Sequence, residues 1–107
     1  MILVTTPDVP GMRIVRVFGL VRGNTIRTRH LGHDVQALLR HIAGGEIREY
    51  TKMMAEAREQ AIDRMIAEAE ALGANAVVAL RFQTAEIMKG AAEMMCYGTA
   101  VLLESDG

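Results

Sequence analysis

The stretch that decides the fold runs from Glu46 to Leu72 and reads EIREYTKMMAEAREQAIDRMIAEAEAL. Neither Gly nor Pro interrupts it, and Gly73 follows where a helix commonly ends on a left-handed residue. The pattern predicts one amphipathic helix about 40 Å long, whereas a compact domain of this length has a radius of gyration of about 13 Å. We therefore expect one end of the helix to overhang, or to be covered by a neighbouring subunit. Its apolar stripe recurs at intervals of three and four residues, the period of one helix face, and comprises Ile47, Tyr50, Met54, Ala57, Ala61, Met65, Ala69 and Leu72.

Before this helix the sequence predicts strands and a second, short helix. Residues 2–6 are apolar and rich in β-branched side chains, and residues 13–22 alternate as a strand does. In the second strand the alternation places Val21 on one side and Phe18 and Leu20 on the other. Gly23-Asn24 then reads as a turn, and residues 25–33 read as a loop or an irregular edge. Asp34 is a suitable N-cap for a short amphipathic helix over residues 34–42, which Gly44-Gly45 ends.

After the long helix come two more predicted strands, over residues 74–85 and 92–103, with a turn near Lys89-Gly90. This order predicts an α+β fold in which one long and one short helix pack on a mainly antiparallel sheet. Residues 1–103 form a single domain, and residues 104–107 form a solvated tail. The last strand is apolar on both faces, so we expect the sheet face that carries Phe18 and Leu20 to meet other copies of the chain. A well-filled monomer core is the alternative.

Composition narrows the class of protein further. The chain has 107 residues, of which 50% are apolar but only 4% aromatic, so a single small domain has little core volume. No apolar run approaches the roughly 20 residues of a membrane span, no secretory signal is visible, and one cysteine excludes an internal disulfide. These features favour a cytoplasmic protein.

Charge is distributed unevenly along the chain, with seven Arg against three acidic residues up to Arg48 and five basic against ten acidic residues after it. Contact between the two halves explains this split better than nucleic-acid binding does.

Motifs of enzymes are absent from the sequence, which has no nucleophile elbow, no phosphate loop and no zinc-protease helix. Glu93 lies among apolar residues, and antiparallel pairing is expected to bring it near Arg81 as an ion pair that specifies register or an interface. Glu46 is expected to lie in the first turn of the long helix, where it complements the helix dipole. We regard Arg81, Glu93, Tyr97 and Glu46 as candidate ligand-binding or interface residues, and we expect no catalytic residue.

Two groups of residues have side chains that bind metals. Strand alternation places Met94 and Cys96 on one face, and their soft sulfur atoms favour Cu(I) or a similar ion. Ordinary core packing is the alternative for both side chains. His30 and His33, with Asp34, are spaced to meet near the start of the short helix, but a site there needs further ligands, and solvated histidines are the simpler interpretation.

Several motifs in order resemble those of the YbjQ family, small bacterial and archaeal proteins of uncharacterised function that carry a heavy-metal-binding label. The resemblance extends over nearly the whole chain and rests on Gly44-Gly45-Glu46, Tyr50-Thr51, Gly73-Ala74-Asn75-Ala76, Arg81-Phe82 and Tyr97-Gly98-Thr99-Ala100-Val101. It implies a dodecin-like subunit that assembles into a ring, with a homopentamer as the expected form. It also implies that Gly73 ends the helix, that Asn75 holds the connection into the next strand, and that Gly98 permits close backbone approach.

The sequence therefore predicts a non-enzymatic homo-oligomer that binds a small ligand or a soft heavy-metal ion at its subunit interfaces. The expected partner is the chain itself, with neither nucleic acid nor membrane. The alternative is a structural or interaction ring without a small-molecule ligand. The identity of any cofactor is left open by the sequence.

Overall fold

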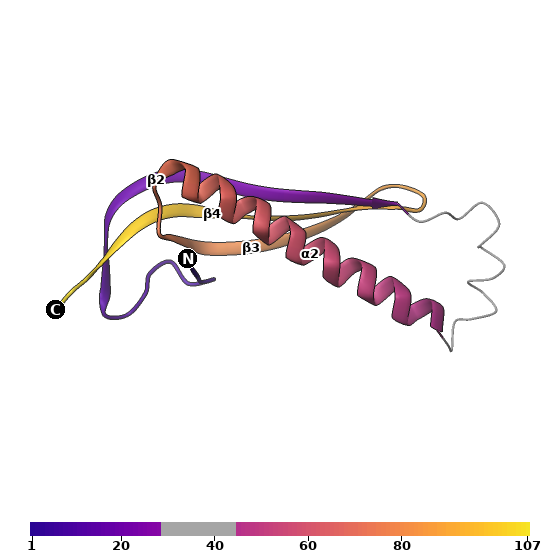
Figure 1. Ribbon diagram of the computed structural model, residues 1–107, viewed down its shortest axis with the longest axis horizontal. Helices are drawn as coiled ribbons and strands as arrows, with labels where there is room; N and C mark the ends of the chain where they lie inside the picture. The colour runs from indigo at the N-terminus through magenta and orange to yellow at the C-terminus, as the bar shows by residue number, and fades with distance from the viewer. Residues whose placement is uncertain (29–44) are drawn as a thin grey trace.

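The computed structural model describes residues 1–28 and 45–107, with side chains in the helix described from Thr51 onward. The elements are β1 (Ile2–Leu3), β2 (Met12–Thr28), α2 (Gly45–Leu72), β3 (Ala76–Met88) and β4 (Ala91–Ser105). The strands form one sheet in the order β1-β3-β4-β2, and α2 lies along it (Figure 1). The predicted α+β class is confirmed. The short helix predicted over residues 34–42 lies outside the described residues.

The sheet is mixed, because its first strand runs parallel to its neighbour. β1 pairs with β3 in parallel through Ile2↔Ala76 and Leu3↔Val77, whereas β4 pairs with both β2 and β3 in antiparallel fashion. The prediction of a mainly antiparallel sheet thus describes the three long strands, and β1 adds a short parallel pair at one edge. β2 forms the opposite edge.

The long helix has the predicted span and the predicted end. Gly73 adopts a φ of 91°, its N–H donates to Glu70 O at 3.0 Å, and the N–H of Ala74 donates to Ala69 O at 3.1 Å. This pair of bonds is the Schellman arrangement, which satisfies carbonyls at a helix C-terminus. The confirmed part of the apolar stripe comprises the buried Ala57, Ala61, Met65 and Ala69, with Met54 packed against them. Leu72 departs from the predicted stripe, because it is 45% exposed at the last turn.

β2 is longer than predicted, since it continues through Gly23 and Asn24 to Thr28. The predicted turn at Gly23-Asn24 and the start of the predicted loop at residue 25 are therefore wrong. The glycine has a different purpose at this position. A Cβ built on Gly23 would collide with the carbonyl oxygen of Ala61 in α2, so the missing side chain lets the helix backbone lie directly on the strand.

Phe18 lies on the opposite side of the sheet from the one predicted. Register shifts interrupt the β2–β4 pairing between Ile14 and Arg16 and between Val17 and Gly19, and each bulge inserts one residue. The second bulge breaks the alternation, so Phe18 packs with the core under α2, on the same side as Val21. Leu20 stays on the far side as predicted and is 66% exposed.

β4 extends two residues into the predicted tail and ends at Ser105. Its two faces are covered by different parts of the chain. One face lies under α2, and the other packs, near the C-terminal end of the strand, against a small cluster contributed by the N-terminal segment. The second cluster comprises Ala76, Val78, Val101 and Leu103, with Ile2, Val4, Val9 and Met12 around it.

Candidate functional site

The candidate site lies on the sheet face that α2 leaves uncovered, which we call the open face. Side chains of β2 alternate strictly over its second half, where Val21, Gly23 and Thr25 are buried towards α2. The intervening residues therefore point away from the helix, as do the residues that pair with them on β4 and β3. Within the described chain, the N-terminal segment covers this face only near the C-terminal end of β4. On β2 the described open-face residues Leu20, Arg22, Asn24 and Ile26 are exposed.

A row of three large polar side chains crosses the open face. Tyr97 on β4 is paired with Arg22 on β2 and with Arg81 on β3, so it lies directly between the two arginines. Residues opposite each other on neighbouring strands share a face, with Cβ atoms about 5 Å apart. Both arginines are exposed, and Tyr97 is half-buried. The sheet thus brings together two guanidinium groups and one phenol from three strands.

Arg81 is held in place by backbone carbonyls. Its Nη1 atom donates to Thr5 O and to Leu80 O, each at 2.8 Å. Thr5 belongs to the N-terminal segment, which docks where β3 is irregular just before Arg81. Ala79 has a φ of 54°, and its N–H donates to Thr6 O at 2.8 Å. A β-bulge and the N-terminal segment together position this guanidinium.

Glu93 shares the open face but does not meet Arg81. It pairs with Ala85 on β3 and with Ile26 on β2, four residues along β4 from Tyr97, or about 13 Å at the rise of a strand. The predicted approach of Arg81 and Glu93 is therefore wrong. The irregularity between Val78 and Arg81 sets the β3 register, which aligns Arg81 with Tyr97. The Glu93 carboxylate instead accepts a hydrogen bond from Asn24 Nδ2 at 3.3 Å.

Met94 and Cys96 share a face, as predicted, but that face lies under α2. Cys96 is fully buried and Met94 is 9% exposed, both within the main core. The Met94 sulfur accepts a hydrogen bond from Thr84 Oγ1 at 3.5 Å. Burial raises the pKa of the Cys96 thiol above its ordinary value, and backbone hydrogen bonds at Gly23 and at Cys96 itself oppose this only in part.

This environment does not suit a heavy-metal ion. Metals bind the thiolate, and the burial that raises the pKa of the Cys96 thiol also disfavours this charged form. Within residues 1–28 and 45–107 no three His, Cys, Asp or Glu side chains gather into a ligand set. The hydroxyl of Thr25, the neighbour of Met94 on β2, is buried and has no hydrogen-bond partner among the described residues, but it is a weak ligand for a soft metal. Met94 and Cys96 act here as core residues.

The remaining candidates are Glu46, the two histidines and Asp34. Glu46 is in the first turn of α2, as predicted from the sequence. His30, His33 and Asp34 lie outside the described residues. No helix in the described part of the chain is both long enough and apolar enough to cross a membrane.

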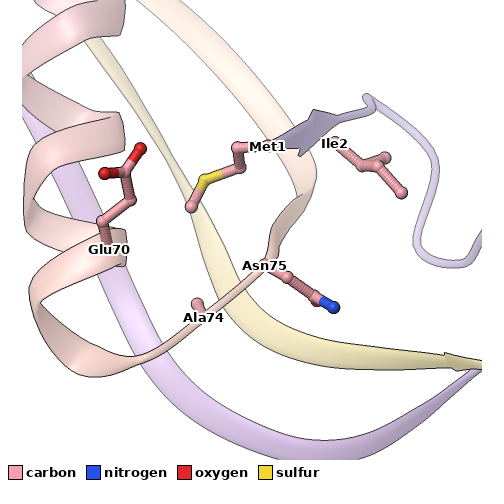
Figure 2. Close-up of a pocket in the computed structure, with 5 residues that line it drawn as sticks. All are labelled: Met1, Ile2, Glu70, Ala74 and Asn75. Carbon is pink, nitrogen blue, oxygen red and sulfur yellow. The ribbon is translucent and has the colours of Figure 1, made fainter.

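A shallow pocket near the N-terminus is lined by Met1, Ile2, Glu70, Ala74 and Asn75 (Figure 2). Asn75 does not offer free polar atoms to this pocket. Its Nδ2 donates to Leu103 O at 2.9 Å, and its Oδ1 accepts from the N–H of Leu103 at 2.8 Å. Asn75 thus fastens the helix-to-strand connection to β4, as the family resemblance implies. The implied close approach at Gly98 is also present, since a Cβ there would lie 2.6 Å from Val77 Cγ1.

Arg22 is the site residue that sequence reasoning missed. Strand alternation places Arg22 on the same side of the sheet as Leu20. Nothing in the sequence, however, aligns it with Tyr97. That alignment depends on two bulges in β2, which shift the register by two residues. The sequence signal that could have indicated a site on this strand is the charge of β2, which has four arginines and no acidic residue.

Comparison with known proteins identifies relatives over the whole chain. The family model YbjQ_1, described as "Putative heavy-metal-binding", matches residues 1–104. A UPF0145 protein of Pyrococcus furiosus is 55% identical over 105 residues, which cover 98% of this chain and 92% of that protein. A UPF0145 protein of Clostridioides difficile is 54% identical over 106 residues, covering 99% and 95%.

A solved structure has a similar fold. It is the crystal structure of a protein of unknown function from Pediococcus pentosaceus, a member of the DUF74 family. The match has a TM-score of 0.66 and covers 97% of this chain and 98% of that one, at 16% sequence identity. At this identity the likeness concerns the fold alone.

Proposed function

The chain belongs to the YbjQ_1 family, and from that premise we propose that it is a non-enzymatic homo-oligomer that binds a small ligand where its subunits meet. A ring of dodecin-like subunits, five in number, is the arrangement that the family resemblance implies, and we adopt it as part of the proposal. A cytoplasmic location belongs to the proposal as well. The buried sulfur pair gives no support to a soft metal as the ligand, so we place the binding site on the open face.

The observation that carries this proposal is the amount of sheet that one helix leaves uncovered. α2 lies over β2 and β4 and hardly touches β3, because a helix about 10 Å wide covers about two strands that are about 4.8 Å apart. Large apolar side chains are exposed as a result. Leu20 and Ile26, 66% and 54% exposed, flank the arginine row on the open face, and Phe82 on β3 is 45% exposed. Apolar surface of this kind marks an interaction site.

The shape of the chain supports assembly. Its radius of gyration is 17.8 Å, and it measures 59 × 22 × 16 Å. A compact domain of this length would have a radius of gyration of about 13 Å. The described strands extend as a long arm that ends in the β3–β4 hairpin, where Ile87 and Met88 are 51% and 65% exposed (Figure 1). A second copy of the chain would bury this arm and its two open sheet edges.

The arginines of β2 support a protein partner over nucleic acid, because they do not form one basic surface. Arg13 pairs with Glu104 at 3.5 Å, Arg16 lies 4.8 Å from the centre of the Phe18 ring, and Arg27 donates to Gln60 Oε1 at 2.8 Å.

An enzymatic role has little support in the described residues. The one thiol is buried with a raised pKa, which makes it a poor nucleophile.

Mass measurement tests the assembly. We expect native mass spectrometry and light scattering at micromolar concentration to give a multiple of 11.7 kDa, with five copies as the expected number. Ile26→Lys places a charge on the open face and should shift the equilibrium towards smaller species. Leu72→Lys is the matched control, since Leu72 is similarly exposed at 45% but lies at the end of α2, and its mass should not change. A wild-type mass of one chain would overturn the proposal.

A structural ring without a ligand is the second candidate. It is favoured by the lining of the pocket in Figure 2, which includes none of the row residues Arg22, Tyr97 and Arg81. Native spectra separate the two candidates. A retained small molecule that is lost in Arg22→Gln supports ligand binding, whereas a ring with neither retained nor added ligand supports the structural role.

A further inference from the structure

We propose that the row Arg22–Tyr97–Arg81 binds a phosphate dianion, either free or as part of a small phosphomonoester. This proposal rests on the ligand-binding part of the proposed function and names the chemical class of the ligand. Its first basis is position. The register places the two arginines on either side of Tyr97 on adjacent strands, so three side chains that carry hydrogen-bond donors start from the same part of the open face.

The second basis is charge that the described side chains do not neutralise. Arg22 differs from Arg13, Arg16 and Arg27, because within the described side chains it has neither an ion-pair partner nor a hydrogen-bond partner. Arg81 bonds only to backbone carbonyls, which orient the guanidinium and leave its positive charge uncompensated. Among the described residues, the acidic side chain on this part of the face is Glu93, which lies four residues along β4 from Tyr97 and accepts a hydrogen bond from Asn24.

The third basis is the match between donors and ligand. Two fixed positive charges are neutralised by one dianion, and arginine binds phosphate oxygens with two parallel N–H donors. Tyr97 adds a hydroxyl donor and a half-buried ring against which an organic group can pack. A carboxylate would satisfy only one of the two guanidinium groups. The row therefore favours phosphate over a monocarboxylic acid.

Equilibrium dialysis of the full chain tests the assignment, with inorganic phosphate as the probe in a buffer free of phosphate and sulfate. We expect saturable binding that strengthens as the pH rises from 5.5 to 7.5, because phosphate gains its second charge near pH 6 to 7 while arginine stays protonated. Acetate at equal ionic strength should compete poorly. Phenyl phosphate, as a second probe, distinguishes free phosphate from a phosphomonoester as the natural ligand. Tighter binding of phenyl phosphate than of inorganic phosphate indicates an organic phosphomonoester, whereas equal binding of the two probes indicates the free ion.

Variants locate the binding on the row. Arg22→Gln and Arg81→Gln should each weaken phosphate binding by about tenfold or more, as expected for a hydrogen bond to a charged group, and Tyr97→Phe by about threefold. Arg13→Gln is the matched control, because this exposed arginine already pairs with Glu104, and it should bind like the wild type. Absence of saturable binding up to 10 mM phosphate, or undiminished binding in both row variants, would overturn the proposal.

The mass of each dialysed sample keeps the two proposals distinct. An assembled protein that does not bind phosphate overturns the phosphate assignment and leaves the assembly intact. A single chain that binds phosphate through Arg22 and Arg81 overturns the assembly and leaves the assignment intact.

Discussion

Replacing Gly23 with alanine should destabilise the protein strongly, because the helix backbone occupies the space that the new methyl group needs. A Cβ at this position collides with the carbonyl oxygen of Ala61, and it lies 2.6 Å from Met65 N and 3.0 Å from Ala61 C. All three are backbone atoms of α2, so no side-chain rotation removes the overlap. Either the helix moves away from β2, or β2 bends away from the helix.

The magnitude follows from the size of that movement. Restoring an ordinary Cβ contact of 3.4 Å to Met65 N requires a displacement of 3.4 − 2.6 = 0.8 Å, and the contact with Ala61 O requires more. The displaced stripe includes Ala57, Met65 and Ala69, which are at most 1% exposed. Overpacking a core costs about 1–3 kcal/mol, and backbone overlap places Gly23→Ala near the upper end, at about 3 kcal/mol. For a domain of this size that lowers Tm by about 12 to 24 °C.

Urea unfolding followed by circular dichroism at 222 nm measures this free energy. Every sample needs the same protein concentration, since the stability of an oligomer depends on it. Gly107→Ala is the control, because nothing lies within 4 Å of a Cβ there, and it should match the wild type. A change below about 0.5 kcal/mol in Gly23→Ala, within the range of neutral surface substitutions, would refute the close approach of helix and strand.

Three further predictions concern other positions. Gly98→Ala should cost about 2 kcal/mol in the same unfolding assay, because its Cβ would lie 2.6 Å from Val77 Cγ1 and 2.9 Å from Val78 O. Asn75→Ala removes two hydrogen bonds to Leu103 and should cost about 1–3 kcal/mol, whereas Asn75→Asp keeps the acceptor but sets a carboxylate oxygen against Leu103 O and should cost at least as much. The raised pKa of Cys96 means that the folded state retains the thiol proton to a higher pH than the unfolded state. Stability should therefore fall as the pH rises above about 8.5, more steeply in the wild type than in Cys96→Ala, and equal slopes in urea titrations would contradict this assignment.

The long helix could be predicted from the sequence because all its determinants are local. A stripe with helical period and a terminal glycine are properties of neighbouring residues, and the structure places Ala61 and Gly73 as those rules require. The β3–β4 hairpin is also local, since only Lys89 and Gly90 separate its strands. These parts of the fold depend little on distant contacts.

The course of β2 depends on contacts that the sequence does not reveal. Gly23-Asn24 has the composition of a turn, yet Gly23 is required by a helix that begins more than 20 residues later. The strand period alone places Phe18 on the open face. A bulge at Gly19, where φ is 113°, instead turns Phe18 to the side of α2. A glycine within a strand, needed for close packing at Gly23 and for a positive φ at Gly19, has the same local signature as a glycine that ends a strand.

The candidate site shows the same limit at the level of register. Arg81, Tyr97 and Glu93 were recognisable as polar residues in apolar strands, but which of them meet depends on how far β3 is shifted along β4. The irregularity between Val78 and Arg81 sets that shift, and its cause is the docking of Thr6 and Val4 onto the backbone of residues 79 and 80. Because the N-terminal segment fixes this irregularity and also holds the Arg81 guanidinium, the geometry of the arginine row depends on the first six residues of the chain.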